Sequence, residues 1–171
     1  MTTAPSPLAG QELQLRMDAI ERQLPVEKPL VPLKVVMFYL KRDEDGVRYL
    51  YESGLLRFAF DIGDAGAKRK EVRIYRESVE EYLLKDYSQI DSRKANDARD
   101  LAAAIRASLP AGRTFTVSKL KDLWTVSSTH LHDLADAGEI SVVPGQSLHV
   151  KESPALLRES VAEFLLRRRI V

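Results

Sequence analysis

The sequence contains no cysteine in its 171 residues. Disulfide bonds and zinc sites built on thiolates are therefore excluded as sources of its stability. It also lacks an apolar run long enough to cross a bilayer and any segment that resembles a secretory signal. With 44% hydrophobic and 30% charged residues, its composition is that of a globular chain rather than a disordered one. We expect a soluble, cytoplasmic protein.

Neither sign of charge is in excess. The chain has 26 lysines and arginines against 25 aspartates and glutamates, so its formal net charge is +1. A protein that binds a polyanion needs local positive charge even when its total charge is near zero. Any such surface must therefore come from an uneven distribution of the basic residues.

Motifs for catalysis are also missing. The sequence has no phosphate-binding glycine loop with its lysine, no zinc-protease motif and no serine elbow. Glu77, Glu80 and Glu81 have the spacing of a solvated helix face rather than of an acid–base pair. The sequence therefore predicts no enzymatic activity and no cofactor.

One ten-residue segment occurs twice, as RESVEEYLLK at 76–85 and as RESVAEFLLR at 158–167. Each copy follows a matching helix end, with Gly54 in the first and Gly138 in the second. The glycines are 84 residues apart and the repeated segments 82 residues apart, so the copies differ by two residues between these points. A surface hairpin accommodates such a difference easily. We expect two copies of one module.

The second copy shows the order of its elements most clearly. Thr116 can cap a helix with an apolar face, and residues 125–128 form a short turn into a second helix that ends at Gly138. The pattern then becomes that of strands around residues 144–147, which predicts a hairpin before the repeated final helix. Helix, turn, helix, hairpin and helix in this order are typical of a winged helix-turn-helix module.

The chain as a whole divides into four parts. The predicted fold class is α+β, mainly α, with two tandem winged helix-turn-helix modules joined by a helical linker. We expect a polar N-terminal segment with a short amphipathic helix at 1–30, the first module at 31–87, the linker at 88–113 and the second module at 114–171.

Two motifs of the second module point to a known family. The sequence reads Thr-Val-x-x-Leu-x-x-Leu-Trp-x-Val-Ser at 116–127 and Arg-Glu-x-Val-x-x-Phe-Leu at 158–165. With these motifs, Phe115 to Leu166 resembles the excisionase-like, MerR-related family of winged DNA-binding domains almost throughout. The first module is similar from Leu50 to Leu84. It diverges earlier, where Lys-Arg-Asp-Glu-Asp-Gly at 41–46 replaces the Ser/Thr-rich start of the family's reading helix.

The resemblance implies sequence-directed binding of double-stranded DNA, by a transcriptional regulator or by an excisionase-like architectural factor in DNA recombination. It implies double-stranded DNA as a partner, a possible homodimer or recombinase or regulatory protein partner, and no membrane. In a bacterial host the protein would be associated with the nucleoid. The second module would read the major groove, and the first would contact the backbone through its wing.

The expected DNA contacts form two groups. The start of the second module's reading helix is small and polar, which allows close approach to base edges. The turn of each wing can contact the minor groove or flanking phosphates. The reading-helix residues are Ser127, Ser128, Thr129, His130 and His132, and the wing residues are Lys68, Arg69, Lys70 and Arg73 in the first module and Gln146 and Ser147 in the second.

Several of these residues also have a purely structural interpretation. Ser127 or Ser128 can cap the helix, and capping is compatible with a phosphate contact. The basic run at 68–70 can protect an exposed strand edge. His130 and His132 suggest metal ligands, but residues two apart on a helix point to different faces, so we expect no metal site.

A protein-interaction scaffold built on degenerate winged modules is the alternative function. From residue 114 to 171, seven lysines and arginines balance seven aspartates and glutamates, whereas a strong nonspecific DNA binder is usually more basic. The acidic start of the first module's second helix, at 43–45, would also repel phosphate.

Overall fold

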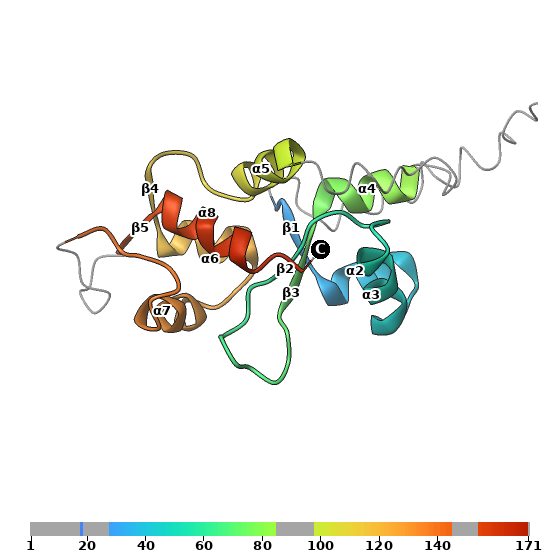
Figure 1. Cartoon of the computed structure of the whole chain (residues 1–171), viewed down its shortest axis with the longest axis horizontal. Helices are drawn as coiled ribbons and strands as arrows, with labels where there is room; N and C mark the ends of the chain where they lie inside the picture. The colour runs from blue at the N-terminus through green and yellow to red at the C-terminus, as the bar shows by residue number, and fades with distance from the viewer. Residues whose placement is uncertain (1–17, 19–27, 85–97, 145–153, 171) are drawn as a thin grey trace, which may run out of the picture.

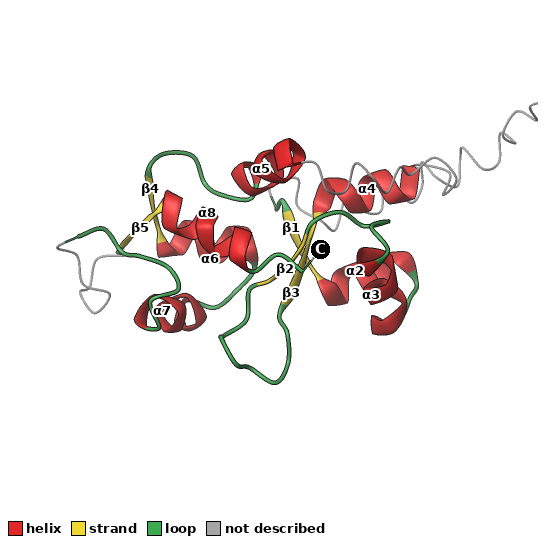
Figure 2. Cartoon of the chain, in the orientation of Figure 1, coloured by secondary structure: helices red, strands yellow, loops and turns green. Residues whose placement is uncertain are grey.

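The computed structural model describes Asp18 and residues 28–84, 98–144 and 154–170 (Figure 1). Its elements are, in chain order, β1 (Leu30–Pro32), α2 (Leu33–Leu40), α3 (Glu44–Glu52), β2 (Ala59–Asp61), β3 (Val72–Tyr75), α4 (Arg76–Leu84), α5 (Ala98–Ala107), β4 (Thr114–Thr116), α6 (Val117–Trp124), α7 (Ser128–Asp136), β5 (Ala155–Leu157) and α8 (Arg158–Arg167). The fold is α+β and mainly helical, as expected (Figure 2). Within the described residues, every helix is too short or too polar to reach across a bilayer.

The order of elements repeats along the chain. The first repeat runs from β1 to α4, and the second runs from β4 to α8, with α5 between them. The starts of β1 and β4, of α2 and α6, and of α3 and α7 are each 84 residues apart, whereas those of α4 and α8 are 82 apart. Where the first repeat has the strand β2, the second repeat has an isolated bridge between Val142 and Leu156. The two-residue difference therefore lies between the second and last helices of the repeats.

Matching turns join the first two helices of each repeat. Lys41 and Thr125 end α2 and α6 in the left-handed conformation, with φ of 50° and 55°. Two residues later, Asp43 and Ser127 cap α3 and α7, each accepting a hydrogen bond from the backbone N–H three residues on, at 2.8 and 3.1 Å. The same backbone turn is thus capped by a carboxylate in one repeat and by a hydroxyl in the other.

The first repeat holds a three-stranded antiparallel sheet in the order β1-β3-β2. The end of the chain covers its β2 edge. The carbonyl of Arg168 accepts a hydrogen bond from Asp61 N–H at 2.8 Å, and Ile170 N–H donates to the carbonyl of Ala59, also at 2.8 Å. The last residues of the second repeat therefore extend the sheet of the first, which satisfies the backbone groups of an edge strand.

The second repeat has a smaller sheet, in which β4 pairs with β5 and Phe115 lies opposite Leu156. The resemblance of residues 50–84 to a winged module implies the hairpin strands β2 and β3, and these are present. The sequence did not predict β1 or β4. Each of these strands has three residues, which are too few to show an alternating pattern.

The two repeats share a hydrophobic core. One apolar cluster lies within the first repeat. The other combines the second repeat with α5 and with five side chains of the first repeat, namely Leu30, Phe58, Phe60, Ile62 and Tyr75. The repeats are therefore packed against one another rather than held apart by a spacer.

Trp124 lies inside this shared core. Its indole is fully buried, stacks on Phe164 with ring centroids 6.1 Å apart, and donates through Nε1 to the carbonyl of Ser108 at 3.1 Å. The preceding helix, α5, buries Leu101 and Ile105 and packs against α8. The helix predicted in the linker is confirmed, and it is a structural part of the second repeat.

Candidate nucleic-acid interface

The start of α7 presents small polar side chains to solvent. Ser127, Ser128 and Thr129 are all exposed. Ser127 is the N-cap, so its hydroxyl is used by the helix, which confirms one of the two expected capping assignments. Within the described part of the chain, the side chains of Ser128 and Thr129 make no hydrogen bond that would hold them away from a ligand. His132, one position beyond the first turn, is partly buried.

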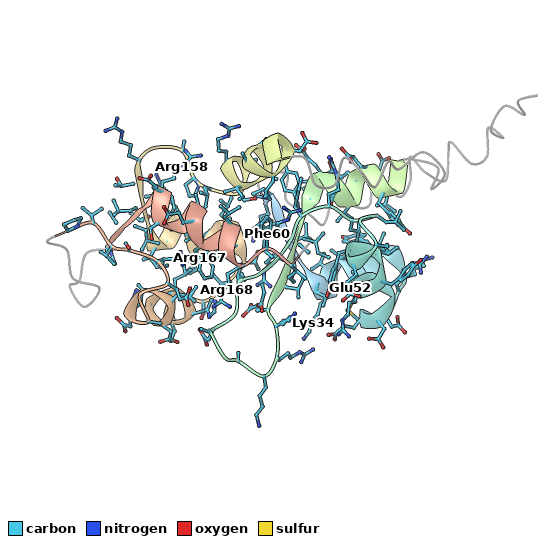
Figure 3. The ribbon with its side chains drawn as sticks, in the orientation of Figure 1. Lys34, Glu52, Phe60, Arg158, Arg167 and Arg168 are labelled. Atoms are coloured by element: carbon cyan, nitrogen blue, oxygen red, sulfur yellow. The ribbon has the colours of Figure 1, made fainter. Side chains whose placement is uncertain are left out.

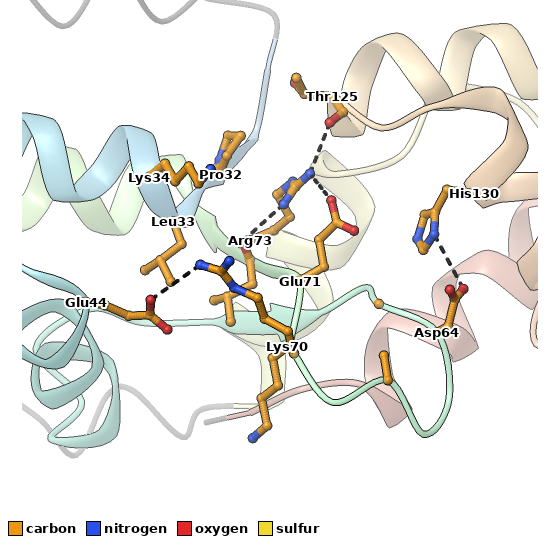
Figure 4. Close-up of a pocket in the computed structure, with 14 residues that line it drawn as sticks. Pro32, Leu33, Lys34, Glu44, Asp64, Lys70, Glu71, Arg73, Thr125 and His130 are labelled. Carbon is orange, nitrogen blue, oxygen red and sulfur yellow. Dashed lines mark hydrogen bonds and ion pairs between the residues drawn. The ribbon is translucent and has the colours of Figure 1, made fainter.

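His130 is directed into the protein. Its side chain is 13% exposed, with Nε2 2.7 Å from the carbonyl oxygen of Ile62 and Nδ1 3.5 Å from a carboxylate oxygen of Asp64 (Figure 4). Both partners belong to residues 62–71, the β2–β3 loop of the first repeat. We therefore correct the expectation that His130 is exposed for a phosphate contact, because its ring is occupied by this loop.

The β2–β3 loop carries the predicted basic run on its surface, with residues 68–70 all exposed. Asp61 holds the two ends of the loop together, because one of its carboxylate oxygens accepts hydrogen bonds from the N–H groups of Gly63 and Glu71, both at 3.0 Å. A Cβ at position 63 would lie 3.1 Å from that oxygen, so glycine leaves room for the closure. The loop is thus held at its base while its lysines and arginine face solvent.

Arg73 is buried, which corrects its assignment to the DNA-contacting surface. Its side chain lies at the inner end of the loop, where Nε donates to the carbonyl of Trp124 and Nη2 donates to the carbonyl of Thr125, both at 3.0 Å. Glu71 accepts a further hydrogen bond at 2.9 Å (Figure 4). Burial lowers the pKa of Arg73, and the nearby Glu71 carboxylate opposes that shift. Arg73 therefore ties the loop to the turn that precedes α7.

An open groove of about 550 Å³ lies beside the loop. Its lining includes Lys34 from α2, Glu44 from α3, Asp64, Arg69 and Lys70 from the loop, and Thr125 and His130 from the second repeat (Figure 4). Its carboxylates lie beside basic groups, with Glu44 3.7 Å from Arg69 and Asp64 3.5 Å from His130. Each of these two carboxylates thus has a basic partner within the chain, the guanidinium of Arg69 for Glu44 and the imidazole of His130 for Asp64.

Three lysines around this groove remain available to an anion. Lys34, Lys68 and Lys70 are exposed, and none of them forms an ion pair within the described residues. Lys34 lies on α2, on the same side of the molecule as the loop (Figure 3). The balance of charge at this surface is positive although the chain as a whole is nearly neutral.

The corresponding start of α3 differs from that of α7. Glu44 and Asp45 occupy its first turn, and each lies 3.3 Å from Arg48 on the next turn. The position equivalent to His130, 84 residues earlier, is Gly46, which has no side chain that could bind a loop as His130 does. The first repeat thus places carboxylates where the second places hydroxyl groups.

The three arginines at the end of α8 serve the fold. Arg167 donates to both the carbonyl and the carboxylate of Glu139, at 3.0 and 3.3 Å. The guanidinium groups of Arg168 and Arg169 lie over aromatic rings, 5.4 and 5.8 Å from the centroids. Arg167 and Arg168 are at the end of α8 that approaches the first repeat (Figure 3). Arg169 joins the repeats through Phe58, whereas the side chains of Arg167 and Arg168 are engaged within the second repeat, so the three do not form a separate basic patch.

Some predicted features lie outside the described residues. These are the second wing's Gln146 and Ser147 and most of the N-terminal segment with its expected amphipathic helix. In the part of the chain that is described, no three His, Asp or Glu side chains are grouped so that they could hold a metal ion.

Comparison with known proteins gives no relative from which a function could be transferred: no family model, no curated protein and no solved structure matches this chain.

Proposed function

We propose that this protein binds double-stranded DNA in a sequence-directed manner through winged helix-turn-helix repeats and has no enzymatic activity. The observation that carries the proposal is the position of the exposed, polar start of α7 next to a loop with three exposed basic residues, 68–70. Regulation of transcription and an excisionase-like role in DNA recombination both require this binding, and DNA bending by the protein would favour the second.

The start of α7 has the properties of a base-reading helix. An α-helix fits the major groove, where base edges display a distinctive pattern of donors and acceptors. Ser128 and Thr129 are short and exposed, so the helix can approach these edges closely and offer two hydroxyl groups. The positive end of the helix dipole also favours a nearby phosphate.

The lysines supply the contact with the phosphate backbone. If Lys34, Lys68 and Lys70 each neutralise one phosphate, the logarithm of the binding constant should fall with the logarithm of salt concentration with a slope of about −3. The number is modest, which fits a small protein that relies on the bases for part of its affinity.

The test is selection of bound duplexes from a random-sequence pool, followed by fluorescence anisotropy on the enriched site at several salt concentrations. The variant Ser128→Glu/Thr129→Glu should no longer select the enriched motif, because its carboxylates are repelled by the phosphates on either side of the groove. Ala102→Glu/Ala103→Glu adds the same charge on exposed positions of α5. It is the matched control and should still select the motif. If the wild type binds no duplex even at low salt, the proposal is wrong.

A protein-interaction scaffold is the second candidate, and one observation favours it. Phe38 and Tyr49 on α2 and α3 are 69% and 65% exposed. The positions 84 residues later hold Asp122 and Asp133, which are ordinary surface residues. This function would be supported by a protein partner that the wild type captures in stoichiometric amount. The partner should stay bound after nuclease treatment, and the variant Phe38→Asp/Tyr49→Asp should not capture it. Loss of the partner on DNA digestion would support DNA binding.

A further inference from the structure

We infer that the protein meets duplex DNA with one composite surface, made by the reading helix α7 of the second repeat and the β2–β3 loop of the first, and not with two winged modules that bind at separate positions. This inference rests on the proposed function. It concerns how the two repeats divide that function between them.

The loop is attached to the second repeat near both of its ends. Near its start, Ile62 and Asp64 face the two ring nitrogens of His130. Just after its end, Arg73 binds the carbonyls of Trp124 and Thr125, immediately before α7. These contacts fix the loop to α7 and its preceding turn, so the exposed residues between the contacts have a defined place beside the helix (Figure 4).

Comparison of the repeats shows that this attachment is not part of the shared framework. The turns between the first two helices and the lengths of these helices correspond between the repeats, but the position of His130 is Gly46 in the first. The position of Arg73, three residues before the last helix, is Ala155 in the second. Each repeat therefore carries one half of a contact that the other lacks, so α3 cannot form the reciprocal attachment through these residues.

The charges have the same asymmetry. The exposed basic run lies in the loop beside α7, whereas Glu44 and Asp45 lie at the start of α3. A phosphate backbone is attracted to the first surface, whereas the carboxylates at the start of α3 are paired with Arg48 and leave no excess of positive charge there. In the view of Figure 1, the loop projects from the sheet between α7 and the α2–α3 pair. The duplex is therefore expected to follow α7 and the loop, with α3 excluded from base reading.

The test is site-directed cleavage of the selected duplex by the full-length chain. Because the protein has no cysteine, single cysteines can carry an iron–EDTA group at chosen places. Ala67→Cys reports on the loop, and Asp133→Cys reports on an exposed position of α7 that the proposed reading does not use. Ala102→Cys on α5 is the control. Anisotropy on each labelled protein shows that binding is intact.

A composite surface predicts cleavage by the loop and α7 probes within about 5 base pairs of one another, which is half of a helical turn. Two separate modules predict centres about one turn, 10 base pairs or more, apart, and that result would overturn the inference while leaving DNA binding in place. Binding without cleavage from either probe would overturn both this inference and the proposed surface. The α5 probe should give no localised cleavage.

His130 is a positioning residue in this scheme. His130→Ala should broaden the cleavage by the Ala67→Cys probe and leave that by the Asp133→Cys probe unchanged, because the loop loses one of its two attachments while α7 keeps its place. His130→Gln, which retains a donor for the Ile62 carbonyl, should restore the narrow pattern. Unchanged patterns in His130→Ala would show that His130 does not position the loop.

Discussion

The imidazole of His130 lies between two acceptors of the β2–β3 loop, the Ile62 carbonyl at 2.7 Å from Nε2 and the Asp64 carboxylate at 3.5 Å from Nδ1. A neutral imidazole donates through only one of its nitrogens, whereas the protonated ring donates through both. Because a carbonyl oxygen can only accept, Nε2 carries the proton in the contact with Ile62, and the ring holds the loop against α7.

Loss of this ring should consequently weaken DNA binding. We expect His130→Ala to lower the affinity for the selected duplex three- to tenfold, which corresponds to about 1 kcal/mol for a partly exposed contact. Anisotropy titrations at constant ionic strength measure the loss, and His132→Gln is the control, which should bind like the wild type. An affinity that is unchanged in His130→Ala would contradict this account.

The Arg73 cluster predicts a large effect on stability. Arg73→Ala leaves the buried carbonyl of Trp124 and the partly buried carbonyl of Thr125 without their donor, which should lower the free energy of unfolding by about 3 kcal/mol. Urea unfolding followed by fluorescence of Trp124, the only tryptophan, measures the loss. The control is Arg69→Ala, whose side chain is 79% exposed and should change stability by less than about 0.5 kcal/mol. Equal losses in both variants would refute the assignment.

The features that the sequence predicted are those set by local interactions. The helices of the second repeat follow from apolar periodicity, and Thr116 and Ser127 are among the expected capping residues because a cap bonds to a backbone N–H only three residues away. The repeated helix follows from a ten-residue match. Such signals involve residues close in the chain, so one sequence contains them.

The contacts between the repeats were not predicted, because they join residues far apart in the chain. His130 and Ile62 are 68 residues apart, and Arg73 and Trp124 are 51 residues apart. One signal was present nonetheless. Alignment of the two repeats pairs His130 with Gly46 and Arg73 with Ala155. A large polar residue in one copy against a small one in the other marks the positions where the copies have different tasks.

The end of the chain provides a further prediction, by amide hydrogen exchange. The N–H groups of Asp61 and Ile170 bond across the edge between β2 and the residues after α8, so both should exchange slowly. Ile170→Pro removes one donor and should also speed the exchange of Asp61 and lower stability by about 1–2 kcal/mol. Ile170→Val retains the donor and should preserve slow exchange. Fast exchange of Asp61 in the wild type would show that this edge is open.

Tyr75 predicts a loss of stability in alkali. It is 6% exposed and packs against Phe58, and its burial, reinforced by the negative charge of Glu77, raises its pKa from the usual 10 to about 12. Folding therefore favours the neutral phenol. Below pH 10 the phenol is neutral in the folded and unfolded chains, and its contribution to stability is fully present. Between pH 10 and about 12 the unfolded chain loses this proton first, so the stability falls.

A shift of this size corresponds to a decrease of about 2–3 kcal/mol in the free energy of unfolding across that interval. Urea unfolding at pH 9, 10, 11 and 12 measures the decrease. Tyr75→Phe should remove much of it, because phenylalanine keeps the ring and has no proton to lose. Tyr39 and Tyr51, whose pKa values are also raised by burial, account for a remainder. Tyr49→Phe, at a side chain 65% exposed, is the matched control and should follow the wild type. If Tyr75→Phe and Tyr49→Phe lose stability in parallel with the wild type, the buried phenol is not the group that links folding to alkaline pH.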